Sequence, residues 1–229
     1  MKKLLFLALL LAAALPTFAQ SSYNFQRRSL FEVLPIHSND IVFLGNSITD
    51  GCEWAELFDN PRIKNRGISA DRTGWMLERL DPIVKGQPKK LFLLIGTNDL
   101  AAGIAPQTVV DNIRRILERF RTESPRTKLY VQSIFPVNGV DAGGKTRKHW
   151  SKGAEIIETN KLLQELCREL DIPYLDIYSV LVDERGLLDK RYTNDGLHLT
   201  GEGYLVWKKA IEQYVKLSLI HISEPTRLR

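Results

Sequence analysis

Three side chains of this sequence could together hydrolyse an ester, namely Ser47, Asp195 and His198. A serine hydroxyl is a weak nucleophile until a base removes its proton, and a histidine can be that base and later the acid that protonates the leaving alcohol. Asp195 precedes His198 by three residues, so one short loop can present both, and the carboxylate can hold the imidazole in the required tautomer. We therefore predict acyl transfer with Ser47 as nucleophile, His198 as base and Asp195 as its orienting carboxylate.

Acyl transfer also needs hydrogen-bond donors for the oxyanion of the tetrahedral intermediate. Three donors suggest themselves: the backbone N–H groups of Ser47 and Gly67 and the side-chain amide of Asn98. Gly67 fits because a residue without Cβ lets a substrate approach its backbone N–H. Each of these residues follows a short apolar run, where a strand would end.

Other residues compete for roles at such a site. His37 and His149 are alternative bases, but His37 precedes the first apolar run and is expected on the surface. His149 and the adjacent Trp150 belong to a long loop and are candidate substrate contacts. Trp54 follows the nucleophile by seven residues and is a third candidate for the pocket wall.

Asp176 and Asp183 are rival carboxylates, and Asp99 is expected to be a structural cap. Other catalytic motifs are missing. Thr49 stands where the second glycine of a Gly-x-Ser-x-Gly elbow would be. The sequence has no His-Glu-x-x-His, paired-cysteine, P-loop or dinucleotide motif. We therefore predict that neither a metal nor a cofactor takes part.

The elements that would position these residues alternate along the chain. Short apolar runs that end at Gly or Pro predict buried parallel strands, and apolar residues spaced three and four apart predict helices. The predicted strands cover residues 41–44, 63–67, 91–95, 129–134 and 172–177, and the predicted helices cover 73–80, 106–120, 154–170 and 204–215. This alternation predicts one α/β domain whose site lies beyond the carboxyl ends of the strands.

The composition is that of an ordinary globular protein. The chain has 229 residues, of which 44% are hydrophobic and 26% are charged. The formal net charge is +5, but much of it lies in the two ends, and the rest of the chain is close to neutral. A nucleic-acid partner, which needs a clustered basic face, is therefore not expected.

The two ends have the composition of segments outside the fold. Residues 1–19 combine a basic start, an apolar run and small residues before a cut after Ala19, as a secretory signal peptide does. We therefore expect export from a bacterium, to the periplasm or medium, with no stable membrane insertion after cleavage, because the apolar run is too short to span. Residues 217–229 resemble a translated sequencing adapter. The hydrolase domain is then expected at residues 20–216.

Four short blocks carry a family resemblance: Gly45-Asn46-Ser47-Ile48-Thr49, the lone Gly67, Gly96-Thr97-Asn98-Asp99, and Asp195-x-x-His198. In order and spacing they are similar to the blocks of the SGNH hydrolases, also called GDSL-type esterases, over residues 41–215. The family's usual first-block aspartate is Asn46 here, which can still accept a local hydrogen bond. The resemblance implies a flavodoxin-like three-layer α/β/α domain whose five parallel strands have the order 2-1-3-4-5.

The resemblance also implies a substrate class. Secreted bacterial members with this first block resemble sugar acetylesterases and platelet-activating-factor acetylhydrolases, so we expect removal of acetyl groups from a small-molecule or oligosaccharide ester. A lysophospholipase or thioesterase on the same site and a non-catalytic carbohydrate-binding module are the alternatives. The implied strand order puts Cys52 and Cys167 on opposite faces of the sheet, which predicts two free thiols. Cys52, closer to the rim of the site, is expected to be the more reactive.

Overall fold

Five parallel strands form one sheet in the part of the chain that the computed structural model describes, residues 22–140 and 147–216. The strands are β1 (Ile41–Gly45), β2 (Ile63–Gly67), β3 (Lys90–Leu94), β4 (Lys128–Gln132) and β5 (Tyr174–Leu175), in the order β2-β1-β3-β4-β5. The predicted order is thus confirmed. The proposed signal peptide, residues 1–19, and the proposed tail, residues 217–229, lie outside the described residues.

Burial explains why these runs form central strands. Every residue of β1 and β3 is buried, so both faces of the sheet must be covered. In the register of the sheet, Gly45 at the end of β1 lies opposite Gly67 of β2 and Leu94 of β3. The residues that follow these strands therefore start from one edge of the sheet, as the sequence predicted for the site.

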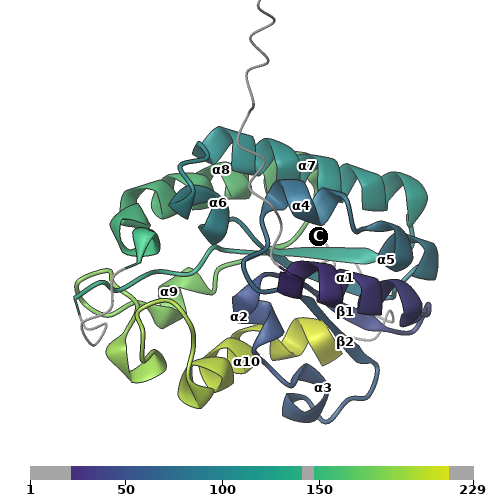
Figure 1. Cartoon of the computed structure of the whole chain (residues 1–229), viewed down its shortest axis with the longest axis horizontal. Helices are drawn as coiled ribbons and strands as arrows, with labels where there is room; N and C mark the ends of the chain where they lie inside the picture. Colours follow the sequence, from purple (N-terminus) through teal and green to yellow (C-terminus); the bar gives the residue numbers. More distant parts are fainter. Residues whose placement is uncertain (1–21, 141–146, 217–229) are drawn as a thin grey trace, which may run out of the picture.

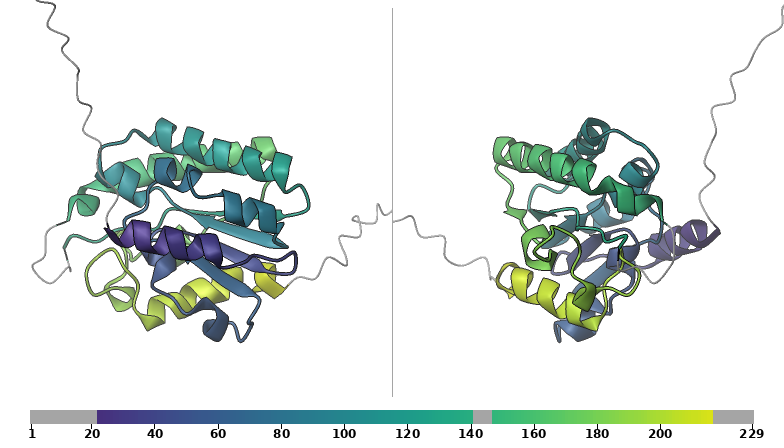
Figure 2. Two further views of the ribbon diagram at one scale, coloured as in Figure 1. Left: turned by 45° about the vertical axis from the view of Figure 1, so that its right-hand side comes forward. Right: turned by 90° about the vertical axis from the view of Figure 1, so that its left-hand side faces the viewer.

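Helices cover both faces of this sheet (Figure 1). One layer holds α4 (Thr73–Leu77), α5 (Asp81–Gly86), α7 (Pro106–Glu123) and α8 (Gly153–Leu170), with α6 (Thr97–Ala101) at its end. The other holds α2 (Ser47–Asp50), α3 (Trp54–Leu57), α9 (Tyr178–Leu181) and α10 (Gly201–Lys216). The turned views in Figure 2 show the same separation, which gives the expected three-layer α/β/α domain.

Several boundaries differ from the prediction. The predicted helix at 73–80 ends early, at Leu77, as α4, and a separate helix that was not predicted, α5, begins at Asp81 with Pro82 in its first turn. The predicted strand at 172–177 keeps only two residues, β5. Two 3₁₀-helices, η1 (Lys148–Lys152) and η2 (Lys190–Tyr192), lie in loops.

An unpredicted helix, α1 (Ser22–Val33), lies against the β2 edge of the sheet. Its sequence has no strong apolar stripe, and Asn24 and Phe31 are its two buried residues. The Phe31 ring lies beneath two guanidinium groups, 4.6 Å from Arg27 and 4.7 Å from Arg66. The Arg27 contact lies within α1, whereas the Arg66 contact comes from β2 and helps to hold α1 against the sheet, which the periodicity of apolar residues does not reveal.

The layer containing α10 is held to the sheet by aromatic packing that includes Trp54. Trp54 is 1% exposed, and its ring stacks 4.3 Å from Phe43 and meets Trp207 of α10 edge-on at 4.5 Å. Its indole N–H donates to the Thr49 carbonyl. The prediction that Trp54 contacts substrate is therefore wrong, because the ring is enclosed in the core.

The two cysteines are free thiols, as predicted, and both are buried. Cys167 lies on α8, and Cys52 follows α2 on the opposite face of the sheet. Burial raises the pKa of each thiol to about 12, so neither thiolate is populated near neutral pH. That argues against the expectation of a reactive Cys52. None of the described helices has the length and apolar character needed to cross a membrane.

Candidate active site

The structure brings Ser47, His198 and Asp195 together although 151 residues separate the first two. Ser47 Oγ lies 2.9 Å from His198 Nε2, and His198 Nδ1 lies 2.8 Å from Asp195 Oδ2. Because Asp195 accepts the proton on Nδ1, Nε2 is left to accept the proton of the Ser47 hydroxyl. This chain of hydrogen bonds is the geometry that a serine nucleophile and its base require.

A sharp strand-to-helix turn presents Ser47. It is the first residue of α2, directly after β1, and the Asn46 side chain caps α2 by accepting the Ile48 N–H at 3.0 Å. Asn46 thus makes the local hydrogen bond predicted for it. Gly45 is required at this turn, because a Cβ there would lie 2.1 Å from Thr49 Oγ1 and 2.6 Å from the Leu94 carbonyl oxygen.

Asp195 is held as an anion by four donors. Its Oδ1 accepts the backbone N–H groups of Leu197 and His198, and its Oδ2 accepts the His198 ring and Arg147 Nη2, the latter at 2.7 Å. Burial alone would raise the pKa of Asp195, but the hydrogen bonds from the His198 ring and backbone outweigh it and lower the pKa to about 2. The carboxylate is therefore charged at any working pH.

Gly67 does not fit its predicted role as an oxyanion donor. Its backbone N–H donates to the Asn65 side chain at 2.8 Å and is already used. The residue must be glycine for another reason, since a Cβ would lie 2.2 Å from the Asp50 backbone nitrogen. The Asn65 amide also donates to the carbonyl oxygens of Thr49, Asp50 and Cys52. Gly67 and Asn65 therefore brace the turn that carries Ser47.

The backbone N–H of Ala70 is available as a donor, unlike that of Gly67. Ala70 is exposed, and among the described residues its backbone N–H donates to no other group. Its φ of 65° is in the left-handed region, which alanine seldom adopts and which often marks a functional position. Asp50 holds Ser69, the residue before Ala70, because its carboxylate accepts hydrogen bonds from the Ser69 backbone N–H and hydroxyl. Ala70 could not be predicted from the sequence, because the feature that marks it is a backbone angle.

Asn98 is oriented by hydrogen bonds on both atoms of its amide. One N–H of Nδ2 donates to the Asp71 carbonyl at 2.9 Å, and Oδ1 lies 2.9 Å from His149 Nε2, which must donate to it. Burial, followed by the charge of Arg147, lowers the pKa of His149 to about 4, so its ring is neutral near pH 7. The second N–H of Asn98 Nδ2 makes no hydrogen bond to the described residues, so the amide keeps one donor for a ligand.

A buried ion pair holds the Asp71 end of this arrangement. Arg79 Nε lies 2.7 Å from Asp71 Oδ2, and the same guanidinium donates to the carbonyl oxygens of Arg66 and Gly45. Both charged side chains are almost fully buried. Arg79 therefore links the ends of β1 and β2 to the turn that contains Ala70 and Asp71. The Asp71 carbonyl in this turn orients the Asn98 amide.

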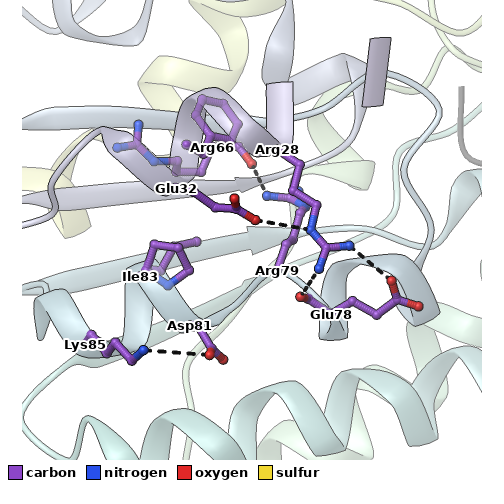
Figure 3. Close-up of a pocket in the computed structure, with 10 residues that line it drawn as sticks. Arg28, Glu32, Arg66, Glu78, Arg79, Asp81, Ile83 and Lys85 are labelled. Carbon is purple, nitrogen blue, oxygen red and sulfur yellow. Dashed lines mark hydrogen bonds and ion pairs between the residues drawn. The ribbon is translucent and has the colours of Figure 1, made fainter. Parts of the chain in front are cut away.

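A cavity of about 360 Å³ opens beside Asn98 and is called the Asn98 pocket below. Its lining consists of Ala70, Arg72, Asn98, Ala101, Ala102, Arg147, Lys148 and His149. His149, a predicted substrate contact, thus faces this cavity. Trp150 is not part of the lining, and its indole N–H instead donates to the Asp195 carbonyl at 3.3 Å. A separate cavity, the α1 pocket, lies between α1 and α5 (Figure 3).

The remaining candidates lie away from the catalytic chain. His37 is exposed before β1, and Asp176 and Asp183 accept hydrogen bonds from Ser179 and Arg185. Asp99 accepts the N–H and hydroxyl of Thr73, so it holds the start of α4 and is structural, as expected. Within residues 22–140 and 147–216, no group of three His, Cys, Asp or Glu side chains could hold a metal ion.

Known proteins are similar to this chain in sequence or in fold. Platelet-activating factor acetylhydrolase IB subunit alpha2 of Rattus norvegicus is 28% identical over 77% of this chain and 76% of its own length. The structure of a GDSL-like lipase from Bacteroides thetaiotaomicron is 25% identical, with a TM-score of 0.71 over 84% of this chain and 97% of its own. An acetyl-xylooligosaccharide esterase mutant from Geobacillus Stearmophilus has the same fold at 13% identity, with a TM-score of 0.64 over 81% and 98% of the two chains.

A family model covers most of the described chain. The model of the GDSL-like lipase/acylhydrolase family matches residues 43–206, which include the Ser47 turn, Asn98 and the Asp195–His198 loop. Together with the sheet order and the solved relatives, this match places the protein among the SGNH hydrolases. The chain belongs to the GDSL-like lipase/acylhydrolase family and is a carboxylic ester hydrolase.

Proposed function

We propose that this protein removes short acyl groups, chiefly acetyl, from carbohydrate esters through an acyl-enzyme on Ser47. The observation that carries the proposal is the continuous chain of hydrogen bonds from Ser47 Oγ through the His198 ring to Asp195. It supplies a nucleophile, a base within reach of its proton, and a carboxylate that fixes the tautomer of that base.

The reaction then has two halves. In the first, His198 Nε2 takes the proton of Ser47 as Oγ attacks the ester carbonyl, and it returns that proton to the alcohol as the carbon–oxygen bond breaks. In the second, a water loses its proton to His198 and displaces the acyl group from Oγ as the free acid. The ionised Asp195 stabilises the imidazolium in both halves.

The oxyanion would be held by the Ser47 and Ala70 backbone N–H groups and the free N–H of Asn98. Ala70 and Asn98 line one cavity, and the neighbouring bonds to Asp71 and His149 fix the direction of the Asn98 amide. Each such donor is worth about 3 kcal/mol of barrier when it meets the transition state better than the ground state. Ala70 takes the place that sequence analysis gave to Gly67.

Two considerations support a short acyl group. The related rat protein is by name an acetylhydrolase. In the Asn98 pocket, the apolar lining consists of three alanines, Ala70, Ala101 and Ala102, with polar or charged residues between them. A lysophospholipase or thioesterase would instead need an extended apolar groove. The carbohydrate part of the proposal follows the family resemblance and the acetyl-xylooligosaccharide esterase among its structural neighbours.

The test compares p-nitrophenyl acetate with p-nitrophenyl octanoate on the wild-type protein. We expect kcat/KM for the acetate ester to exceed that for the octanoate ester by about tenfold or more. The octanoyl chain has several more methylenes, and a lining with only three alanines offers them little apolar surface. Octanoate preference would indicate the lipid-type hydrolase. No hydrolysis of either ester by the folded protein would indicate a non-catalytic carbohydrate-binding module.

Export is part of the proposal and rests on residues 1–19. Expression of the full chain in a bacterium should give periplasmic or secreted protein whose first residue is Gln20. N-terminal sequencing of that material decides it, and an intact Met1 in the cytosolic fraction would refute both the signal peptide and export.

A further inference from the structure

The helix α1 contacts two carboxylates beside the proposed oxyanion donors, Asp50 and Asp71. Tyr23 Oη donates to Asp50 Oδ2 at 2.7 Å, and Arg27 Nη2 lies 3.6 Å from Asp50 Oδ1, so both oxygens of this carboxylate face α1. Asn24, the residue after Tyr23, places its Nδ2 3.5 Å from Asp71 Oδ1. One helix turn therefore reaches both carboxylates.

Asp50 joins the two segments that carry the proposed backbone donors. It is the last residue of α2, whose first residue is Ser47, and its Oδ2 also accepts the backbone N–H and hydroxyl of Ser69 at 3.2 and 3.0 Å. Because Ser69 precedes Ala70 directly, the carboxylate sets where the Ala70 N–H lies relative to the Ser47 N–H. The Asp50 side chain is 10% exposed, so water competes little with its protein donors.

Asp71 holds the other side of Ala70. Its carboxylate pairs with the buried Arg79, and its carbonyl orients the Asn98 amide. Both neighbours of Ala70 thus depend on carboxylates that α1 contacts. An alanine with a φ of 65° keeps this unfavourable angle only where the surrounding contacts impose it. The contacts around Ala70 therefore bear on the position of its N–H.

The Tyr23 hydroxyl is suited to hold Asp50 without being needed to hold α1. Burial, followed by the hydrogen bond to Asp50, raises the pKa of Tyr23, so the hydroxyl is protonated and donates near neutral pH. The residue is 41% exposed, so its hydroxyl adds little to the core. The helix has a separate attachment at the buried Phe31, which packs against Arg66 of β2.

We propose that Tyr23 is a positioning residue of the oxyanion hole, which acts through Asp50 to hold the Ala70 N–H in place for the oxyanion. The inference rests on the proposed function. It assigns a part in catalysis to α1, a helix that precedes residues 43–206, the range that the family model matches. A contact this far from the reacting atoms can matter, because a displacement of about 1 Å in an active site can cost about 10²-fold in rate.

Tyr23→Phe removes the hydroxyl and keeps the ring. We expect kcat on p-nitrophenyl acetate to fall by about three- to tenfold with KM nearly unchanged, because a displaced donor stabilises the transition state less well. The melting temperature should change little, since the lost hydroxyl is partly exposed. Tyr178→Phe is the matched control: it removes a hydroxyl that donates to the Gly186 carbonyl instead, and kcat should stay at the wild-type value.

Asp50 variants test whether Tyr23 acts through this carboxylate. Asp50→Ala should lower kcat by about 10- to 100-fold. In the Asp50→Ala background, Tyr23→Phe should cause no further loss, because its partner is already gone. Asp50→Asn is the conservative variant: its amide oxygen can still accept from Tyr23 and Ser69, so kcat should stay within about threefold of the wild-type value.

The outcomes distinguish this inference from the proposed function. The positioning role is refuted if Tyr23→Phe keeps the wild-type kcat, raises KM alone, loses no more than Tyr178→Phe, or adds its loss to that of Asp50→Ala. Tyr23→Phe and its control decide the question even if Asp50→Ala does not fold. Each of these results leaves the esterase proposal intact, whereas absence of hydrolysis by the folded wild-type protein would refute the proposed function itself.

Discussion

The Asn98 pocket and the α1 pocket are nearly equal in volume, about 360 and 370 Å³, yet they differ in what their charges do. In the α1 pocket, Arg28 binds Glu32 and Glu78, and Lys85 lies 3.9 Å from Asp81 (Figure 3). In the Asn98 pocket, by contrast, no carboxylate belongs to the lining, and the Asn98 amide faces the cavity. The two pockets thus differ in the polar groups that line them and not in size, and the polar groups are the better indication of a functional site.

Ser47→Ala should have the largest effect on activity of the variants considered. Loss of the nucleophile should lower kcat by about 10⁴-fold or more, because the remaining groups act as a unit with it. The melting temperature should stay nearly unchanged, since only a small hydroxyl is lost. Ester hydrolysis and thermal unfolding measure the two effects. Ser151→Ala, at an exposed position of η1 outside the lining of the Asn98 pocket, is the control. Residual activity of more than a few percent in Ser47→Ala would identify another nucleophile.

Arg79→Met tests the residue that joins the two regions. Arg79 lines the α1 pocket, but its guanidinium binds Asp71 and the ends of β1 and β2. Removal should lower the free energy of unfolding by about 3–5 kcal/mol, because Asp71 would be left as an unpaired buried charge. Urea unfolding measures the change. Arg79→Met/Asp71→Asn should recover part of the stability, and a loss below 1 kcal/mol in the single variant would contradict the account.

Asn98→Ala tests the amide that faces the Asn98 pocket. It should lower kcat by about 10²–10³-fold with little change in KM, because the amide would bind the transition state better than the ground state. Steady-state kinetics on p-nitrophenyl acetate measure both parameters. A raised KM with normal kcat would make Asn98 a substrate-binding residue, and an unchanged kcat/KM would remove it from the oxyanion hole.

The sequence predicted features that depend on local pattern. Apolar runs ending at Gly or Pro located the strands, and the motif around Ser47 and the spacing of Asp195 and His198 located the three side chains that the structure joins by hydrogen bonds. Gly67 was misinterpreted because a glycine at a strand end has two explanations, close approach of a ligand or of backbone. Here the Asp50 backbone makes the close approach.

Features that depend on contacts between distant segments could not be predicted. Arg147 binds Asp195 from 48 residues away, and Asn65 braces the Ser47 turn from the next strand. Trp54 follows the nucleophile closely in sequence, but the chain turns its ring into the core beside Trp207. The donor role proposed for Ala70 depends on a φ of 65°. A positive φ can be expected from the sequence at a glycine, but an alanine gives no indication of it.

Arg28→Ala should have the smallest effect and is the strictest test of the comparison. The Arg28–Glu78 pair at the α1 pocket is partly exposed, with 28% and 57% of the two side chains accessible. Its removal should therefore cost about 0.2–1 kcal/mol of stability and leave kcat/KM unchanged. Arg114→Ala, which breaks the exposed Arg114–Glu169 pair between α7 and α8, is the matched control. A drop in kcat/KM of more than twofold in Arg28→Ala alone would show that the α1 pocket affects catalysis. The ion pairs that line the α1 pocket would then be no reason to exclude it from function.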